Sequence, residues 1–336
     1  MIEITDLYKY YGDYRAIGPI SVTIERGQVV GLLGLNGAGK TTTLRILACD
    51  LLPTSGQVRI DGIDVINEPE RIRAKVGYLP DNPPLYGEMT VREYLRFAGR
   101  LRGVSSKEIG KRVAEVLGLT ELSSVADTTI QTLSHGFRQR VGIAQTIVHQ
   151  PVVVVLDEPI SGLDPVQIVE MRQLIRNLRE DHAVVISSHI LSEISETCDR
   201  ILVIRDGQIA ASGTEAELSA QLHGGMTIDV TVNRPERVDE ADVVGLLAKL
   251  NHVERVELVA QRESGDRITS LRVTMANDVR QTLVTSLTGA GCTLLELART
   301  QRELENVFLQ LSEVRIGVTP SGSAGASMAK RSEELS

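Results

Sequence analysis

The chain has 336 residues, enough for two domains, and 42% of them are hydrophobic, which allows a substantial core. A formal net charge of −8 argues against a general DNA or RNA binder. The sequence shows neither an apolar run long enough for a transmembrane helix nor a signal-peptide pattern at its start. Three widely separated cysteines make no metal motif and fit a reduced, cytosolic compartment.

The N-terminal residues predict strands. Residues 2–7 alternate apolar and polar side chains, as an edge strand would, and residues 20–24 alternate again. Four tyrosines crowd residues 8–14, and Tyr11 is our candidate to stack its ring on a planar ligand. Ordinary packing at a strand end explains a tyrosine there equally well.

A glycine-rich motif follows. Residues 34–42 read GLNGAGKTT and fit the template G-x-x-x-x-G-K-[ST]. An apolar stretch that predicts a buried strand precedes them, and residues 42–52 continue at helical spacing. Such a turn points backbone N–H groups and the positive end of the helix dipole at one spot, which suits a triphosphate. We expect Lys40 to reach the β- and γ-phosphates and the Thr41 hydroxyl to ligate Mg²⁺. The alternative is a glycine-rich turn formed by chance.

The middle of the chain predicts short strands and then helices. Residues 57–60, 63–65 and 76–79 read as strands, the last one ended by a proline-rich segment. Thr90 and Glu93 form a capping-box pattern at the start of a helix over residues 90–102, and residues 107–117 predict a second helix. The pattern stays helical to about residue 128, which indicates a helical subdomain inserted into an α/β core.

Two apolar runs end in chemically active residues. Residues 152–156 predict a strand buried on both faces, as in a parallel sheet, and Asp157 and Glu158 follow it. Ligands of such sheets bind at the carboxyl ends of strands, so we assign Asp157 to Mg²⁺ and Glu158 to the base that accepts a proton from the attacking water. Caps of a following helix are the alternative. Residues 183–188 repeat the design, and His189 at their end is expected to reach the same crevice and bond the γ-phosphate or the water.

A second phosphate-binding surface is predicted at Ser134, which caps another helix with its N–H groups exposed. One triphosphate does not need two such surfaces in one chain. Two copies facing each other would use both, because each copy could close the phosphate loop of the other. The sequence therefore predicts a dimer with nucleotide sandwiched between its copies.

The last third of the chain changes character. The patterns predict strands at residues 227–232, 253–260, 268–275 and 293–298 and helices at 238–250 and 278–289, the β-α-β-β-α-β order of a ferredoxin-like motif. A closing helix is expected at 302–311, and residues 317–336, rich in Ser, Gly and Ala, are expected to be disordered.

The order and spacing of six motifs resemble the ATP-binding subunit of ABC transporters over residues 2–218. GLNGAGKTT resembles the Walker A motif and VVVVLDE the Walker B motif, LSHGF stands where the signature LSGGQ belongs, and residues 161–164, SGLD, look like the D-loop. His189 falls at the switch histidine and Tyr11 at the adenine-stacking aromatic. The form of several motifs and the C-terminal domain look most like the ABC-2 export branch, close to gliding-motility and multidrug-type subunits.

The resemblance implies an α/β fold: a P-loop NTPase (ABC ATPase) core over residues 1–222 with a helical subdomain at about 86–142, a small α+β ferredoxin-like domain over 223–316 and the tail 317–336. It implies catalysis by Glu158 and His189 and Mg²⁺ binding by Thr41, Asp157 and Asp81. The implied ATP-binding residues are Tyr11, Gly34, Leu35, Asn36, Gly37, Ala38, Gly39, Lys40, Thr41 and Thr42, with Ser134, Gly136 and Asp164 acting in trans.

Two departures from the family pattern stand out. Asp81 falls where the family has the Q-loop glutamine, which senses the membrane partner. Its side chain is shorter and acidic, so the resemblance supports this sensing role less well at Asp81 than it would at a glutamine. His135 and Phe137 replace a glycine and a glutamine of the signature, while Ser134 and Gly136 are kept. We expect altered hydrolysis kinetics and not inactivity.

The function implied is an ATPase that pairs with a second copy or a paralogue and drives a separate membrane permease for export. The protein would be cytoplasmic and held on the inner face of the cell membrane through its permease, without nucleic acid. A soluble ABC-type ATPase acting in translation or DNA repair is the alternative. The C-terminal domain could regulate or stabilise the dimer, or be a passive appendage.

Overall fold

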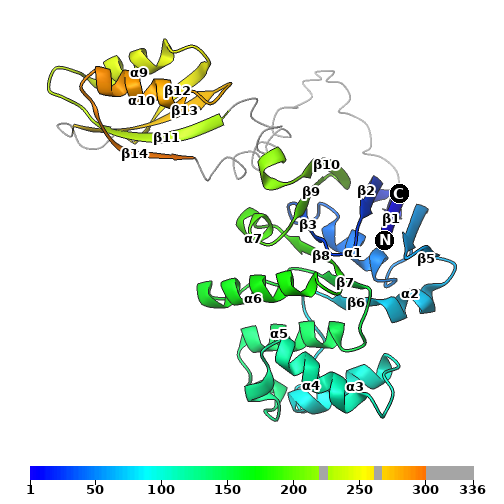
Figure 1. Cartoon of the computed structure of the whole chain (residues 1–336). Coiled ribbons are helices and arrows are strands. Elements are labelled where there is room, and N and C mark those ends of the chain that lie inside the picture. The colour runs from blue at the N-terminus through cyan, green and yellow to red at the C-terminus, as the bar shows by residue number, and fades with distance from the viewer. Residues whose placement is uncertain (219–225, 261–266, 300–336) are drawn as a thin grey trace, which may run out of the picture.

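The computed structural model describes residues 1–218, 226–260 and 267–299. Up to residue 218 it contains two sheets with helices around them, and residues 226–299 form a third sheet with its own helices (Figure 1). The closing helix predicted at 302–311, the tail 317–336 and the domain boundaries at 222 and 316 lie outside the described residues.

The first sheet is antiparallel, with strand order β2-β1-β4-β5. Its strands are β1 (Ile2–Tyr11), β2 (Tyr14–Ile24), β4 (Ser55–Ile60) and β5 (Ile63–Asp64). The expectation of an edge strand at residues 2–7 is wrong, because β1 pairs with β2 on one side and β4 on the other. The alternating side chains arise because a sheet with one solvated face shows the same pattern in its interior strands.

The second sheet has the order β10-β9-β3-β8-β7-β6 and positions the site. All its neighbouring strands are parallel except β10, which turns back on β9. The strands are β3 (Val29–Leu33), β6 (Val76–Leu79), β7 (Val153–Leu156), β8 (Ala183–Ser188), β9 (Arg200–Arg205) and β10 (Gln208–Gly213). Alternate valines of β7 belong to the two cores on opposite faces of the sheet, which confirms the prediction of a strand buried on both sides.

Helices cover both faces of this sheet and gather beyond its β6 edge, where α3, α4 and α5 contact one another (Figure 1). Thr90 caps α3 in a full capping box with Glu93, as predicted. The helices α2, α6 and α7 are not among the predicted elements, and α1 ends earlier than expected. The helices are α1 (Lys40–Leu47), α2 (Pro69–Lys75), α3 (Val91–Leu101), α4 (Ile109–Leu119), α5 (His135–Ile147), α6 (Pro165–Leu178) and α7 (Leu191–Ser195).

Helix α5 approaches β6 so closely that only glycine fits between them. A Cβ on Gly77 would fall 2.0 Å from the Thr146 carbonyl oxygen. We expect Gly77→Ala to lower the free energy of unfolding by about 1–3 kcal/mol, because the backbone must shift to admit the methyl group. Thermal unfolding followed by circular dichroism measures this. Gly118→Ala in α4 is the control, since nothing lies within 4 Å of its added Cβ; its melting temperature should stay the same or rise, and equal melting temperatures for the two variants would contradict the close approach.

Residues 226–260 and 267–299 form the predicted β-α-β-β-α-β unit. The antiparallel sheet has the order β12-β13-β11-β14, so the first and third strands of the unit lie at its centre. Apolar side chains of β11 and β13 form a core with those of the two helices. The elements are β11 (Met226–Asn233), α9 (Glu240–Ala248), β12 (Val253–Ala260), β13 (Ile268–Met275), α10 (Arg280–Gly289) and β14 (Thr293–Arg299).

Candidate functional site

A cavity of about 450 Å³ lies between the glycine-rich loop and Glu158. All its lining residues except Tyr14 and Ala16 are predicted site residues. The lining consists of Tyr11, Tyr14, Ala16, Leu35, Asn36, Gly37, Gly39, Lys40, Thr41, Thr42, Asp81 and Glu158. Residues far apart in the sequence meet here because β3, β7 and β8 are parallel and end at the same edge of the sheet.

The loop that precedes α1 wraps around its own lysine. Lys40 is only 5% exposed, and its Nζ donates to the carbonyl oxygens of Gly34 at 2.8 Å and Leu35 at 3.4 Å. Gly39 has a φ of +108°, and a Cβ there would fall 2.5 Å from Ile17 Cγ2, so the turn requires glycine. A buried ammonium group at the N-terminus of a helix is an anion-binding arrangement.

Glu158 contacts a lysine with one carboxylate oxygen and a histidine with the other. Its Oε1 is 3.4 Å from Lys40 Nζ, and its Oε2 is 3.0 Å from His189 Nδ1. Its backbone φ is +48°, a left-handed conformation that is costly for a residue with a Cβ and is often found at functional sites. The structure therefore places the predicted base between the predicted phosphate-binding lysine and the predicted switch histidine.

Asp157 lies behind Glu158 and is 2% exposed. Burial raises the pKa of its carboxyl group, while hydrogen bonds from the hydroxyls of Ser187 and Thr41 oppose that rise. Among the residues that the structure describes, no group of three or more His, Cys, Asp or Glu side chains could hold a metal ion alone. The Asp157 carboxylate and the Thr41 hydroxyl beside it are oxygen donors, the type of ligand that Mg²⁺ takes together with phosphate oxygens and water.

Ser187 connects the two acids and is not among the predicted site residues. Its hydroxyl donates to Asp157 Oδ1 at 2.5 Å and accepts the backbone N–H of Glu158 at 3.0 Å. One side chain thus fixes both the buried carboxylate and the strained backbone after it. The sequence signal for Ser187 was a polar residue near the carboxyl end of a buried strand, two positions before His189.

Ser134, Gly136 and Asp164 do not line this cavity in the described part of the chain. Ser134 caps α5 by accepting the Phe137 N–H at 3.4 Å, and Asp164 caps α6 by accepting two N–H groups. Gly136 is packed against α6. Three predicted site residues therefore lie on two neighbouring helix starts, apart from the phosphate loop of the same chain.

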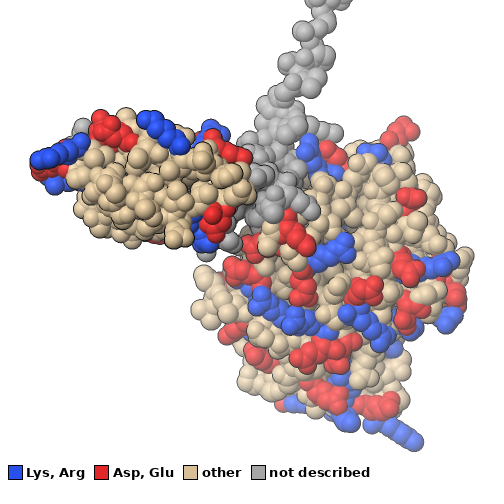
Figure 2. Space-filling model, turned by 45° about the horizontal axis from the view of Figure 1, so that its top comes forward, with Lys and Arg blue, Asp and Glu red and all other residues tan. Residues whose placement is uncertain are grey.

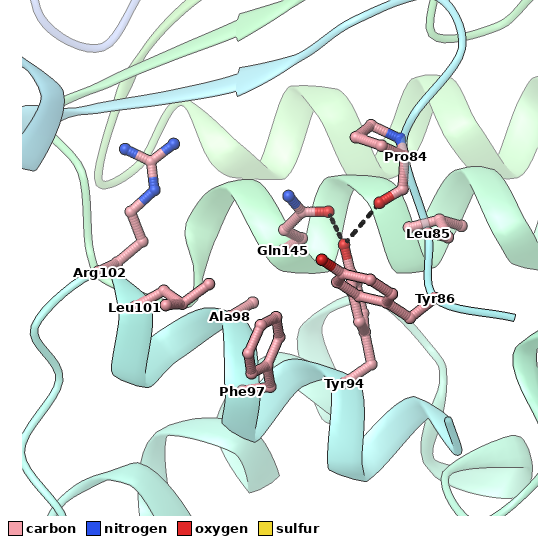
Figure 3. Close-up of a pocket in the computed structure, with 9 residues that line it drawn as sticks. All are labelled: Pro84, Leu85, Tyr86, Tyr94, Phe97, Ala98, Leu101, Arg102 and Gln145. Atoms are coloured by element: carbon pink, nitrogen blue, oxygen red, sulfur yellow. Dashed lines mark hydrogen bonds between the residues drawn. The ribbon is translucent and has the colours of Figure 1, made fainter. Parts of the chain in front are cut away.

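A second cavity, of about 360 Å³, lies between α3, from Tyr94 to its C-terminal end, and the segment that follows Asp81. Figure 3 shows its aromatic wall, in which Tyr86 makes edge contacts with Tyr94 at 6.0 Å and Phe97 at 5.4 Å between ring centres. The Tyr94 hydroxyl, whose pKa burial raises to about 12, lies 2.5 Å from Gln145 Oε1. This hydroxyl is also 3.4 Å from the Pro84 carbonyl oxygen, so α3, α5 and the segment after Asp81 meet at it (Figure 3).

Arg102, at the end of α3, closes the other side of this second cavity (Figure 3). Its guanidinium donates to the Arg73 carbonyl oxygen. Across residues 1–218, 226–260 and 267–299, no carboxylate forms an ion pair with it. The second cavity thus combines an aromatic and aliphatic wall with a cation whose charge is uncompensated.

Comparison with known proteins adds relatives. Residues 17–161 match the protein family described as ABC transporter. The chain is 32% identical to the linearmycin resistance ATP-binding protein LnrL of Bacillus subtilis, over 93% of this chain and 98% of the relative. It is 32% identical to the daunorubicin resistance ATP-binding protein DrrA3 of Streptomyces coeruleorubidus, over 93% and 95%.

Solved structures resemble about two thirds of the chain. One, described as a dimeric post-hydrolysis state of an ATP-binding cassette with bound ADP and Pi, is 27% identical, with a TM-score of 0.58 over 64% of this chain and 98% of that one. Within the described ranges, no helix has the length and apolar character that crossing a bilayer would need.

Proposed function

Because this chain belongs to the family of ABC transporter ATP-binding proteins, we propose that it dimerises around two ATP molecules and drives a separate membrane permease for export. It is an ATP-binding subunit and an ATPase, as its family and its structural relatives are. The names of relatives that confer resistance to linearmycin and daunorubicin support export as the direction. The protein would then be peripheral on the cytoplasmic face of a membrane, held there by its permease.

The observation that carries the proposal is the position of Glu158, which lines the cavity together with Lys40 and also contacts His189. Lys40 and the N–H groups of residues 34–42 would hold the phosphates of ATP, and Tyr11, 47% exposed at the rim, would stack on adenine. Thr41, Asp157 and Asp81 would hold Mg²⁺, which neutralises charge on the phosphates.

Hydrolysis then requires a base. Water attacks the γ-phosphorus, the bond to the β–γ bridging oxygen breaks, and Glu158 takes the proton that the water loses. The contact between His189 Nδ1 and Oε2 would hold the Glu158 carboxylate in position, while Oε1 faces Lys40. His189 would thereby act on the base as well as on the γ-phosphate.

A second copy would complete each site. Ser134, Gly136 and Asp164 would approach the γ-phosphate bound by the other chain, because they lie away from the cavity of their own chain. Exposed apolar side chains adjoin the site segments, with Leu35 48%, Val166 68% and Ile190 40% exposed. Burial of such side chains against a partner is favourable, which supports a face-to-face dimer.

The second cavity is our proposed docking site for the permease. Its aromatic wall suits apolar anchor residues, and Arg102 suits a carboxylate on the same segment (Figure 3). The Tyr94 hydroxyl contacts Pro84, in the segment that follows Asp81, and Asp81 itself lines the nucleotide cavity. The same hydroxyl contacts Gln145 on α5, the helix that Ser134 caps. Docking of the permease would therefore affect Asp81 at the nucleotide cavity of the same chain and Ser134, which would contact the nucleotide of the other chain.

We expect Arg102→Glu to weaken permease binding by about tenfold or more, since it sets like charges against each other in the interface. The ATPase rate of the isolated subunit should not change. The measurement is stimulation of ATP hydrolysis by the partner permease, identified by co-purification and reconstituted in vesicles. Arg100→Glu, on the same helix but outside the cavity lining, is the control. Equal stimulation of the two variants would contradict this docking site.

The alternative, a soluble ATPase acting in translation or DNA repair, is disfavoured. Lys and Arg are interspersed with Asp and Glu on the face shown in Figure 2, without the extended basic patch that nucleic acids select. The net charge of −8 points the same way. For the C-terminal unit we keep the proposed limits 223–316, and we leave open whether it regulates the dimer or is passive.

A further inference from the structure

A histidine stands at the first residue of α5, directly after Ser134. Its Nε2 is 3.2 Å from the carbonyl oxygen of Ser161. A carbonyl oxygen only accepts hydrogen bonds, so Nε2 carries the hydrogen and donates it. The bond joins two segments separated by 26 residues in the sequence: the start of α5, with Ser134, and the turn of residues 161–164, which ends in Asp164.

Other close contacts reinforce this link. A Cβ on Gly136 would fall 2.6 Å from Gln167 Oε1, so α5 begins directly against the first turn of α6. Gly162 turns with a φ of +74°, and a Cβ there would lie 3.3 Å from His135 Nε2. The imidazole therefore sits over the turn and adds a directional bond to an otherwise van der Waals contact.

The two segments share one proposed role, because Ser134 and Asp164 both belong to the set that would reach the nucleotide of the other copy. We infer that His135 is a positioning residue for hydrolysis: its imidazole ties the start of α5 to residues 161–164 of the same chain, so that both approach the partner's nucleotide as one unit. A glycine, which the family signature carries here, has no side chain to make this bond. The inference rests on the proposed dimer and concerns how its two halves are aligned.

The test compares His135→Ala with His135→Gln, whose amide N–H₂ group can donate to the same carbonyl oxygen. One lost hydrogen bond predicts a fall in kcat of about 2- to 10-fold for His135→Ala. KM for ATP should stay unchanged, because the phosphate loop of the same chain is intact. His135→Gln should recover most of kcat. The side chain is exposed, so both variants should melt at the temperature of the unaltered protein.

Two outcomes would overturn the inference: an unchanged kcat in His135→Ala, or a loss in His135→Gln as large as in His135→Ala. A KM that rises with unchanged kcat would do so as well, since it would place the effect on binding of ATP by the same chain. A dimerisation assay of the unaltered protein with ATP separates this result from failure of the proposed function. If the unaltered protein dimerises and hydrolyses ATP and His135→Ala has the same kcat, the proposed dimer is retained and only the positioning role of His135 is rejected.

Discussion

Glu158→Gln should hydrolyse ATP about 10²- to 10⁴-fold more slowly than the unaltered protein, the usual contribution of a positioned general base. Glutamine keeps the size of the side chain, and its amide can still face Lys40 and His189. It cannot accept the proton of the attacking water. ATP should therefore bind and remain uncleaved, and the dimer that it closes should persist.

Phosphate release in the steady state measures the first effect, and light scattering after gel filtration with and without ATP measures the second. Glu180→Gln, an exposed residue after α6, is the control and should behave as the unaltered protein does. A Glu158→Gln protein that stays monomeric at saturating ATP and still hydrolyses it would contradict both the base and the dimer.

Lys40→Met should weaken ATP binding by about two orders of magnitude. Each hydrogen bond between a charged donor and a phosphate is worth about 1.5–3 kcal/mol, and each 1.4 kcal/mol is roughly tenfold in affinity. The substitution also removes the cation 3.4 Å from Glu158 Oε1, so the carboxylate loses its buried partner. Methionine fills a similar volume, which limits the effect on folding.

Isothermal titration calorimetry with a non-hydrolysable ATP analogue measures this affinity. The control is Lys111→Met, because Lys111 lies on α4 with its side chain 85% exposed, away from the cavity. Binding by Lys40→Met within a few-fold of the control would show that the phosphates are held elsewhere.

The elements that were predictable from the sequence are those whose local pattern and tertiary role agree. GLNGAGKTT lies between a buried strand and a helix, and the valine run before Asp157 is buried on both faces of a parallel sheet. The capping box at Thr90 and the order of strands and helices along residues 226–260 and 267–299 follow from short-range signals in the same way.

The misses have physical causes. Asp164 followed by Pro165 is the local start signal of α6, and Asp164 is also the last residue of the D-loop-like SGLD, so one residue belongs to both the turn and the helix. The C-cap of α1 is Ala48, and Cys49 next to it adopts a φ of +53°, a left-handed residue that periodicity does not reveal. Ser187 could not be recognised as a link between Asp157 and Glu158 because that role depends on the pairing of β7 with β8. The residues predicted to act in trans remain a prediction, since one chain does not show their target.

The central claim is that each ATP site is built from two chains, and mixing two inactive variants tests it most directly. Lys40→Met lacks the phosphate-binding lysine, and Ser134→Arg blocks the surface offered to the other copy; each alone should be inactive. In a mixed dimer, the lysine of the Ser134→Arg chain faces the serine of the Lys40→Met chain, so one complete site forms and ATP hydrolysis returns. A mixture that contains mixed dimers by mass spectrometry and remains as inactive as its components would contradict the account.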